Sequence, residues 1–383
     1  MIEGDVEGDA VSFKCRGCAA ENVVPVLDVG EQPCADYFPL EDTPGPDPRW
    51  PLALWLCREC TLVQLGPVQP QLPEEPLAVE SATSREHAEA SVKEILSDFP
   101  ELSGRVVFEF GSPHGGSWLD HLYSAGCRLA GDGEKADLVV DVHGIVHEAQ
   151  YGEMLKLRAE RLAPGGLLVM EFHHLLPLFI GNQFDTIRHG HWVYMSLRAL
   201  RNLAALHGLT VESVRQVEMY GGSLMVMLRH TGDAKPDPSV DVVLEDEEAA
   251  GIADEVQLGT LQEAAWHAAG ALHDELVRHK AAGRTVLGYG APSKAPLLLD
   301  LSKVTTDLLP FTVDLAPGKH GRRIPGAGMV PIRPIDDLKA ARPDVVLVLT
   351  WDIADEIIAQ LEADGGWGTT YLVPLPEPHE RGR

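Results

Sequence analysis

The chain has 383 residues, and 45% of them are apolar, which is enough for two or three domains with cores of their own. Its 58 acidic residues against 31 basic ones give a formal net charge of −27, which repels a polyphosphate backbone, so we expect no nucleic acid partner. The sequence has neither an apolar run of the roughly 20 residues that a membrane span needs nor the apolar core of a signal peptide, so we expect a soluble, cytoplasmic protein with no membrane partner.

Four of the six cysteines form two Cys-x-x-Cys pairs, Cys15 with Cys18 and Cys57 with Cys60. In a cytoplasmic protein such pairs indicate a metal site rather than disulfides. Each short turn aims two sulfurs at one point, and four thiolates complete the tetrahedral shell of zinc. We therefore predict one structural zinc, with no open coordination position, in a zinc-binding subdomain over residues 1–76.

A glycine turn follows the first strand expected in the next domain. Apolar residues at helical spacing predict a helix over 84–99, and the apolar run at 106–108 predicts a strand. The strand leads into Glu109, Gly111 and Gly115, a turn in which backbone N–H groups and a helix N-terminus can approach a nucleotide-like ligand. The alternative is a tight strand–helix turn that binds nothing.

The stretch after this turn is unusually short. A short strand within 127–131 is followed by Asp132, at the place of a ribose-binding acid, and the next strand follows at 136–142. Because a βαβ unit needs roughly 30 residues, the helix and strand that normally enclose an adenine have no room here. A helix at 151–162, a strand at 167–171, a helix at 197–206 and strands near 211–217 and 223–228 complete a domain over residues 77–231.

The charged, proline-containing stretch 232–248 is interpreted as a domain boundary. After a helix at 252–281, a second α/β domain over residues 249–383 opens with a strand and a glycine turn at 286–294. Lys294 in this turn and Lys319 in a basic cluster suit a phosphate, and the alternative is a structural turn with surface lysines. Further strands are expected at 311–314, 345–349 and 371–373.

The order of these parts resembles the zinc-containing sugar C-methyltransferases of antibiotic pathways, which belong to the class I S-adenosylmethionine (SAM) methyltransferase group. The resemblance covers nearly the whole chain and is carried by GEQPCADYF, CRECTLVQL, EFGSPHGG, FDTIRHGHWVYMSL, GGSL, YGAPSKAPLLL, VDLAPGKHGRRIPG and VPLPEP. It implies an α/β fold with an N-terminal zinc-binding subdomain, an abbreviated class I methyltransferase-like Rossmann domain and a C-terminal Rossmann-like domain. It also implies methylation of nucleotide-linked keto-deoxysugars.

The sequence departs from the family pattern where the chemistry belongs. Pro113 and His114 stand for Asn and Asp in the glycine loop, and Arg-His-Gly-His at 188–191 stands for Tyr-His-Glu-His. Tyr220 replaces a histidine, and residues 76–81 replace a tyrosine-rich loop. These changes favour a repurposed scaffold, because fold does not fix function.

The leading hypothesis is a SAM-independent cyclase or isomerase of natural-product biosynthesis, antibiotic or polyketide, acting on a small molecule. The alternative is an active SAM-dependent C-methyltransferase of a nucleotide-linked deoxysugar or related ketone, and a third possibility is a non-enzymatic partner of an active homologue. We predict that the chain does not use SAM as a methyl donor, so that Glu109, Gly111, Gly115 and Asp132 form only a vestigial cofactor site. The resemblance places acid–base and substrate-binding residues in one cleft: His189, His191, Arg188, Tyr194 and Tyr220 as catalytic residues, and His173, His174, Trp192, Ser223, Lys294 and Lys319 as substrate-binding residues.

Overall fold

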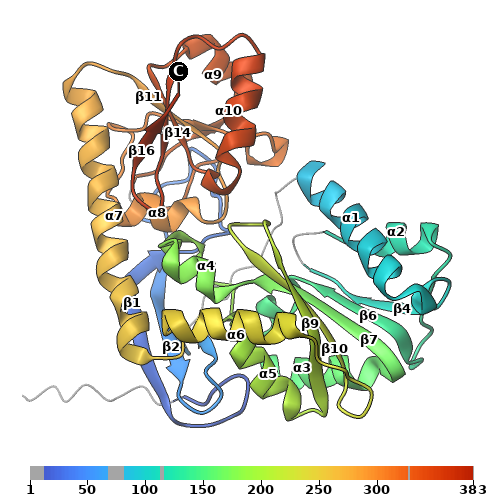
Figure 1. Cartoon of the computed structure of the whole chain (residues 1–383). Coiled ribbons are helices and arrows are strands. Elements are labelled where there is room, and N and C mark those ends of the chain that lie inside the picture. Colours follow the sequence, from blue (N-terminus) through green and yellow to red (C-terminus); the bar gives the residue numbers. More distant parts are fainter. Residues whose placement is uncertain (1–12, 68–81, 113–115, 327, 383) are drawn as a thin grey trace, which may run out of the picture.

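The computed structural model describes residues 13–67, 82–112, 116–326 and 328–382, and these fold around three sheets (Figure 1). No helix in these ranges is long and apolar enough to cross a membrane. The predicted α/β class is confirmed, because two six-stranded, mainly parallel sheets follow an N-terminal four-stranded one.

The N-terminal sheet is antiparallel and includes a strand from the middle of the chain. Its strands are β1 (Val23–Pro33), β2 (Arg49–Cys57), β3 (Val63–Leu65) and β8 (Val193–Tyr194), in this order. In the last pair, Val63 lies opposite Tyr194. The zinc-binding segment is therefore tied by backbone hydrogen bonds to the loop that carries the Arg-His-Gly-His motif.

The central sheet has the strand order β5-β4-β6-β7-β10-β9, and β10 runs antiparallel to both of its neighbours. Six residues, 130–135, separate β5 from β6, so the predicted absence of a helix and strand here is confirmed. The strands are β4 (Val106–Phe110), β5 (Arg128–Leu129), β6 (Ala136–Val142), β7 (Leu162–His173), β9 (Leu209–Val217) and β10 (Ser223–His230).

Helices cover both faces of the central sheet because its buried strands are apolar on both sides. Val140 and Val169 face α1 and α2, whereas Val139 and Leu168 face α3, α5 and α6, as the alternation along a strand requires (Figure 1). The helices are α1 (Ala82–Asp98), α2 (Leu119–Ser124), α3 (Tyr151–Arg161), α4 (Leu175–Ile180), α5 (Leu197–Ala205) and α6 (Pro238–Ala250), with short 3-10 turns η1 (Pro100–Leu102), η2 (Ile145–His147) and η3 (Phe184–Thr186).

The stretch interpreted as a domain boundary contains α6. Asp237 caps the helix by accepting a hydrogen bond from the Ser239 N–H, and Val240, Val243 and Leu244 are buried on one face. The interpretation as a boundary overlooked this helical spacing because acidic residues surround it.

The C-terminal sheet has the order β13-β12-β11-β14-β15-β16, parallel except for β16. Its strands are β11 (Val286–Tyr289), β12 (Thr312–Val313), β13 (Ile332–Arg333), β14 (Val345–Val348), β15 (Thr370–Val373) and β16 (His379–Arg381). The helices around it are α7 (Glu255–Ala281), α8 (Ala295–Leu301), α9 (Ile335–Ala341) and α10 (Ala354–Ala363), with 3-10 turns η4 (Pro317–Lys319) and η5 (Trp351–Ile353).

One core joins the N-terminal sheet to the C-terminal unit. Leu27 and Leu54 of the N-terminal sheet belong to the same buried cluster as Leu272 of α7 and Leu347 of β14. In Figure 1, α7 runs alongside both units. The N-terminal segment therefore packs into the body of the protein and does not stand apart from it.

Candidate functional site

The four predicted zinc ligands converge. The ligand atoms of Cys15, Cys18, Cys57 and Cys60 all lie within 4.8 Å of one another, and the Cys15–Cys60 and Cys18–Cys57 sulfurs are 3.6 and 3.7 Å apart. A tetrahedral zinc with Zn–S bonds of about 2.3 Å needs sulfur–sulfur distances of about 3.8 Å. The residues fit a structural zinc.

The cysteine turns are docked tightly on the central unit. The Gly152 N–H donates to the Arg16 carbonyl at 2.9 Å, and a Cβ added at Gly152 would lie 2.3 Å from the Gly17 carbonyl oxygen. Only glycine allows the start of α3 to come this close to the first Cys-x-x-Cys turn.

The glycine turn after β4 is open on the side of Gly111. A Cβ added at Gly111 or Gly116 would have no neighbour within 4 Å among the described residues, apart from those next to it in the chain. Glu109 turns inward, where its carboxylate accepts hydrogen bonds from the Ser117 hydroxyl at 2.5 Å and the Trp118 N–H at 2.7 Å, and burial raises its pKa. Asp132 is exposed in the turn after β5.

Because β4, β5, β6 and β7 run parallel, this turn and the ends of the other three strands share one edge of the sheet. The described part of the turn lies at this edge, and between β5 and β6 the chain has only the short turn 130–135. Pro113, His114, Gly115 and residues 76–81 lie outside the described residues.

A cluster of aromatic side chains lies along the same edge. The ring centroid of His173, at the end of β7, is 4.9 Å from that of His143, 5.6 Å from that of His191 and 5.5 Å from that of Tyr220. His147 in η2 lies 4.7 Å from His191. We call these five residues the histidine cluster.

Glu171 supports one side of the histidine cluster. Its buried carboxylate accepts hydrogen bonds from His87 of α1 at 2.8 Å and from the Nε2 of His143 at 3.2 Å. Burial opposes the charge of Glu171, but the two histidines lower its pKa to about 2. In neutral His143 with Nε2 donating to this carboxylate, the buried Nδ1 is an acceptor, and it has no hydrogen-bond partner among the described residues.

The other side of the cluster holds a histidine in the opposite tautomer. The Nη2 of Arg188 lies 2.7 Å from the Nε2 of His191. A guanidinium can only donate, so this Nε2 is an acceptor and the ring proton of neutral His191 is on Nδ1. The guanidinium also pairs with the carboxylate of Asp36.

Two residues of the cluster have strained backbones. His143 and Tyr220 adopt φ angles of 54° and 55°, in the left-handed region that side chains with a Cβ rarely occupy. Desolvation by burial lowers the pKa of His173 well below its usual value, so this imidazole is neutral.

A cavity of about 330 Å³ lies between the central and C-terminal units. Its lining includes Gln183 and Gly221 on one side and Trp351 and Leu375 on the other. Gly221 follows Tyr220 of the histidine cluster in the sequence, although no residue of the cluster is among the described residues that line the cavity.

Several predicted site residues are engaged elsewhere. His174 is buried, with its Nε2 2.8 Å from Glu247, and His189 packs edge-on against Trp50, with its Nε2 3.3 Å from the Pro51 carbonyl oxygen. These contacts place both side chains outside the histidine cluster, and the substrate-binding role of His174 and the acid–base role of His189 stay predictions.

The remaining cleft residues also have internal partners. The Tyr194 hydroxyl accepts a hydrogen bond from the Arg188 N–H at 2.9 Å, the Ser223 hydroxyl donates to the Met219 carbonyl at 3.1 Å, and Trp192 lies under the Arg16 guanidinium. Each contact holds a loop or strand end in place.

The two lysines expected to bind phosphate are paired within the chain. The Nζ of Lys294 pairs with Asp352 and lies 3.9 Å from the Trp351 ring centroid. The buried Nζ of Lys319 donates to the Ala291 carbonyl at 2.8 Å and lies 3.7 Å from Asp314. The alternative interpretation, a structural turn, describes these contacts better.

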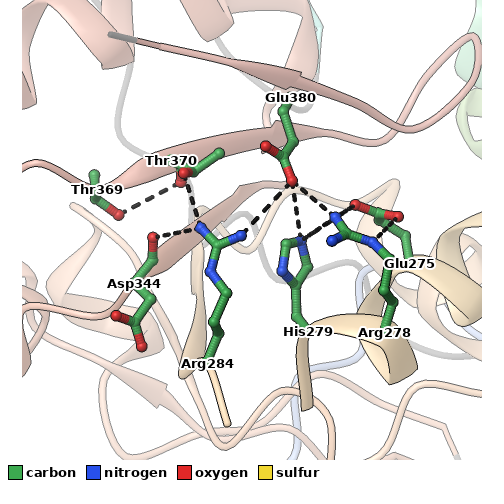
Figure 2. A network of polar contacts seen from close by, with 8 residues as sticks. All are labelled: Glu275, Arg278, His279, Arg284, Asp344, Thr369, Thr370 and Glu380. Atoms are coloured by element: carbon green, nitrogen blue, oxygen red, sulfur yellow. Dashed lines mark hydrogen bonds and ion pairs between the residues drawn. The ribbon is translucent and has the colours of Figure 1, made fainter. Parts of the chain in front are cut away.

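A second group of acidic and histidine ligands lies far from this edge, where β16 meets α7. Figure 2 shows His279 between Glu275 and Glu380, with Arg278 and Arg284 reaching the Glu380 carboxylate at 2.8 and 3.8 Å. Because two guanidinium groups already neutralise these carboxylates, we interpret this as an ion-pair network that anchors the last strand rather than as a metal site.

Comparison with known proteins confirms the predicted resemblance. Residues 218–376 match the model of a C-methyltransferase C-terminal domain, and residues 15–71, which include all four cysteines, match the model of a zinc binding domain. The C-methyltransferase NovU of Streptomyces niveus is 29% identical over 405 residues, which cover 95% of this chain and 96% of NovU. The chain is therefore similar to the zinc-containing C-methyltransferases in both matched segments and, at lower identity, over nearly its whole length.

Solved structures are similar only at a coarse level. A SAM-dependent methyltransferase from Listeria monocytogenes is 11% identical, with a TM-score of 0.30, and the aligned region covers 37% of this chain and 97% of the Listeria chain. The N-methyltransferase NodS from Bradyrhizobium japonicum is 15% identical, with a TM-score of 0.30, and the aligned region covers 42% of this chain and 100% of the NodS chain. Likenesses at this level support no conclusion about the chemistry of this chain.

The similarity to C-methyltransferases favours the alternative function over the leading hypothesis of a SAM-independent cyclase or isomerase. The comparisons likewise do not support the prediction that the chain has abandoned SAM.

The sequence-based reasoning missed His143, Glu171, His87 and His147. His143 follows a parallel strand directly, at the edge where α/β sheets bind ligands, and this position could have singled it out. Glu171 interrupts an apolar strand, which is a weaker signal. The pairing of His87 with Glu171 arises from the docking of α1 and has no local signature.

Proposed function

We propose that this chain is a SAM-dependent enzyme of natural-product biosynthesis that methylates a carbon next to a ketone. The substrate class is a nucleotide-linked keto-deoxysugar or a related ketone. Its similarity to C-methyltransferases supports methyl transfer to carbon, and the open side of Gly111 supports a ligand at the β4 turn.

One observation carries the proposed chemistry: the buried Nδ1 of His143 has no hydrogen-bond partner among the described residues, while its Nε2 lies 3.2 Å from the Glu171 carboxylate. A carboxylate behind an imidazole orients the ring and stabilises the imidazolium that forms when it takes a proton. The strained backbone of His143 is further evidence that this orientation is imposed by the fold.

His143 and His191, which carry their ring protons on opposite nitrogens, have different roles at a ketone. The Nδ1 of His143 takes the proton from the carbon beside the carbonyl, and the electron pair of that C–H bond moves to form the enolate. The Nδ1–H of His191 is suited to donate to the oxygen on which the negative charge develops. His191 therefore acts as a hydrogen-bond donor, in place of the base predicted from the sequence.

SAM, when bound, supplies a methyl group on a positively charged sulfur, which the enolate carbon can attack. The backbone at Gly111 and Gly116 would admit its methionine portion, and Asp132 would hold its ribose hydroxyls. The body of the acceptor would extend into the cavity between Gly221 and Trp351.

The test separates proton removal from methyl transfer. In deuterated buffer, a thymidine-diphosphate-linked 4-keto-6-deoxysugar should gain deuterium beside the ketone, and with added SAM it should gain a methyl group at that carbon. Removal of the base in His143→Gln should slow both processes by roughly 10²–10⁴-fold. His267→Gln is the control, because His267 is 74% exposed on α7.

Wild-type rates of exchange and methylation in His143→Gln would show that this imidazole is not the base. Exchange without any methylation in the wild-type protein would instead favour an isomerase.

A further inference from the structure

Asp36 connects the N-terminal segment to the histidine cluster. It lies in the loop after β1, and its carboxylate pairs with the Nη1 of Arg188, with side-chain exposures of only 10% and 8%. Its other oxygen accepts a hydrogen bond from the hydroxyl of Ser293, in the loop after β11. Three segments that are far apart in sequence thus meet at one carboxylate.

The guanidinium of Arg188 transmits this contact to the cluster. Its planar, rigid fork presents one nitrogen to Asp36 and the other to the Nε2 of His191 at 2.7 Å. When Asp36 fixes one side of the fork, the direction of the other N–H is fixed as well, because the group cannot rotate without losing both contacts.

Stability alone does not explain such an arrangement. A buried ion pair stabilises a fold little compared with apolar residues of the same volume, because both charges must leave water. What the pair does provide is a defined orientation of the Arg188 fork, and that orientation decides which nitrogen of His191 carries the proton.

We infer that Asp36 is a positioning residue, which holds Arg188 against the Nε2 of His191 and thereby keeps the ring proton of His191 on Nδ1. The catalytic meaning of this tautomer, a donor aimed at the developing oxyanion, rests on the proposed function. The tautomer itself does not depend on it.

The experiment reads the tautomer directly in the full-length, zinc-loaded protein. Long-range ¹H–¹⁵N spectra of protein labelled with ¹⁵N-histidine distinguish protonated from unprotonated ring nitrogens. His191→Gln assigns the signal by its disappearance. Wild-type protein should show His191 with a protonated Nδ1 and an unprotonated Nε2, and Asp36→Asn should show a mixture of both tautomers, because the fork has lost its charged anchor.

Asp47→Asn is the matched control. Asp47 forms a buried pair with Arg323, with side-chain exposures of 4% and 1%, and its side-chain hydrogen bonds to described residues go to Arg323 and Gly326, outside the histidine cluster. A purely structural effect of losing a buried aspartate would appear in both variants, whereas the His191 signal should change only in Asp36→Asn.

If Asp36→Asn does not fold, Ser293→Ala decides, since it removes only one hydrogen bond to Asp36 and should shift part of the His191 population. The inference would be overturned if His191 of the wild-type protein were protonated on Nε2. It would also be overturned if the His191 signal were unchanged in Asp36→Asn or, where that variant does not fold, in Ser293→Ala. A chain that shows the tautomer change but does not methylate keeps this inference and loses only the proposed function.

Discussion

The two six-stranded sheets carry the same sequence signal at the same edge, yet their glycines serve opposite purposes. Beside Gly111, after β4, an added Cβ would meet no described residue within 4 Å other than its chain neighbours. Within β11, a Cβ on Gly288 would lie 2.6 Å from the Thr312 hydroxyl, and in the turn after β11 one on Gly290 would lie 2.9 Å from a Thr350 methyl. The first turn leaves room for a ligand, whereas the second is required by packing.

The polar groups near the two turns differ in the same way. On the central edge, the Nδ1 of His143 is buried and has no partner in the part of the chain that the structure describes. On the C-terminal edge, Lys294 and Lys319 are held by Asp352 and by the Ala291 carbonyl. A strand followed by glycines and a charged residue therefore does not by itself identify a binding site.

Removal of the zinc should produce the largest effect and should separate the two edges. Structural zinc contributes on the order of 10 kcal/mol to the folding of small zinc domains. In Cys57→Ser we expect loss of zinc and faster hydrogen exchange first in β8 and the histidine cluster, because the cysteines belong to the core of the central unit. Exchange–mass spectrometry, with metal content measured in parallel, checks this. Equal or greater deprotection of β11 and β14 would contradict it.

Substitution of alanine for Gly290 and for Gly111 compares the packing of the two turns directly. Gly290→Ala should lower the free energy of unfolding by about 1–3 kcal/mol, because Gly290 has a φ of +91° and its Cβ would collide with Thr350. Gly111→Ala should change the free energy of unfolding by less than about 1 kcal/mol. Urea denaturation of both variants measures the difference. Similar losses would show that the two turns are packed alike.

The smallest expected effect is the change in the free energy of unfolding with pH that arises from the neutral His173. Since desolvation lowers its folded pKa well below 6.5, the unfolded chain binds more protons than the folded chain once the pH falls below that value. Stability should therefore fall toward acid, by up to about 1.4 kcal/mol per pH unit for this group, until the folded pKa is reached. His173→Gln should reduce the slope between pH 6.5 and 5 in denaturation experiments, and an unchanged slope would show that another group is responsible.

The elements of the fold could largely be predicted from periodicity. The four cysteines, the strand at Val106, the short connection before Ala136 and the long helix ending at Ala281 all have local signals. The two-residue strand β8 and the helix α6 were missed, because β8 is created by pairing with the distant Val63 and α6 is rich in acidic residues.

The site could be predicted less well, because its chemistry depends on which atoms remain without partners. The sequence motif indicated Arg188 and His191, and the structure brings them together. It equally indicated His189, which turns toward Pro51. The Glu171–His143 pair joins two neighbouring strands and could only be recognised once their register was known.

The most direct test of this account is calorimetric titration of S-adenosylhomocysteine into the wild-type protein and Gly111→Val. If the open side of the β4 turn receives the cofactor, the wild-type protein should bind saturably. The valine side chain, whose Cβ meets no described residue within 4 Å beyond its chain neighbours, should weaken binding at least tenfold, about 1.4 kcal/mol. Absence of binding to the wild-type protein would contradict SAM-dependent methylation and return the SAM-independent cyclase or isomerase to first place.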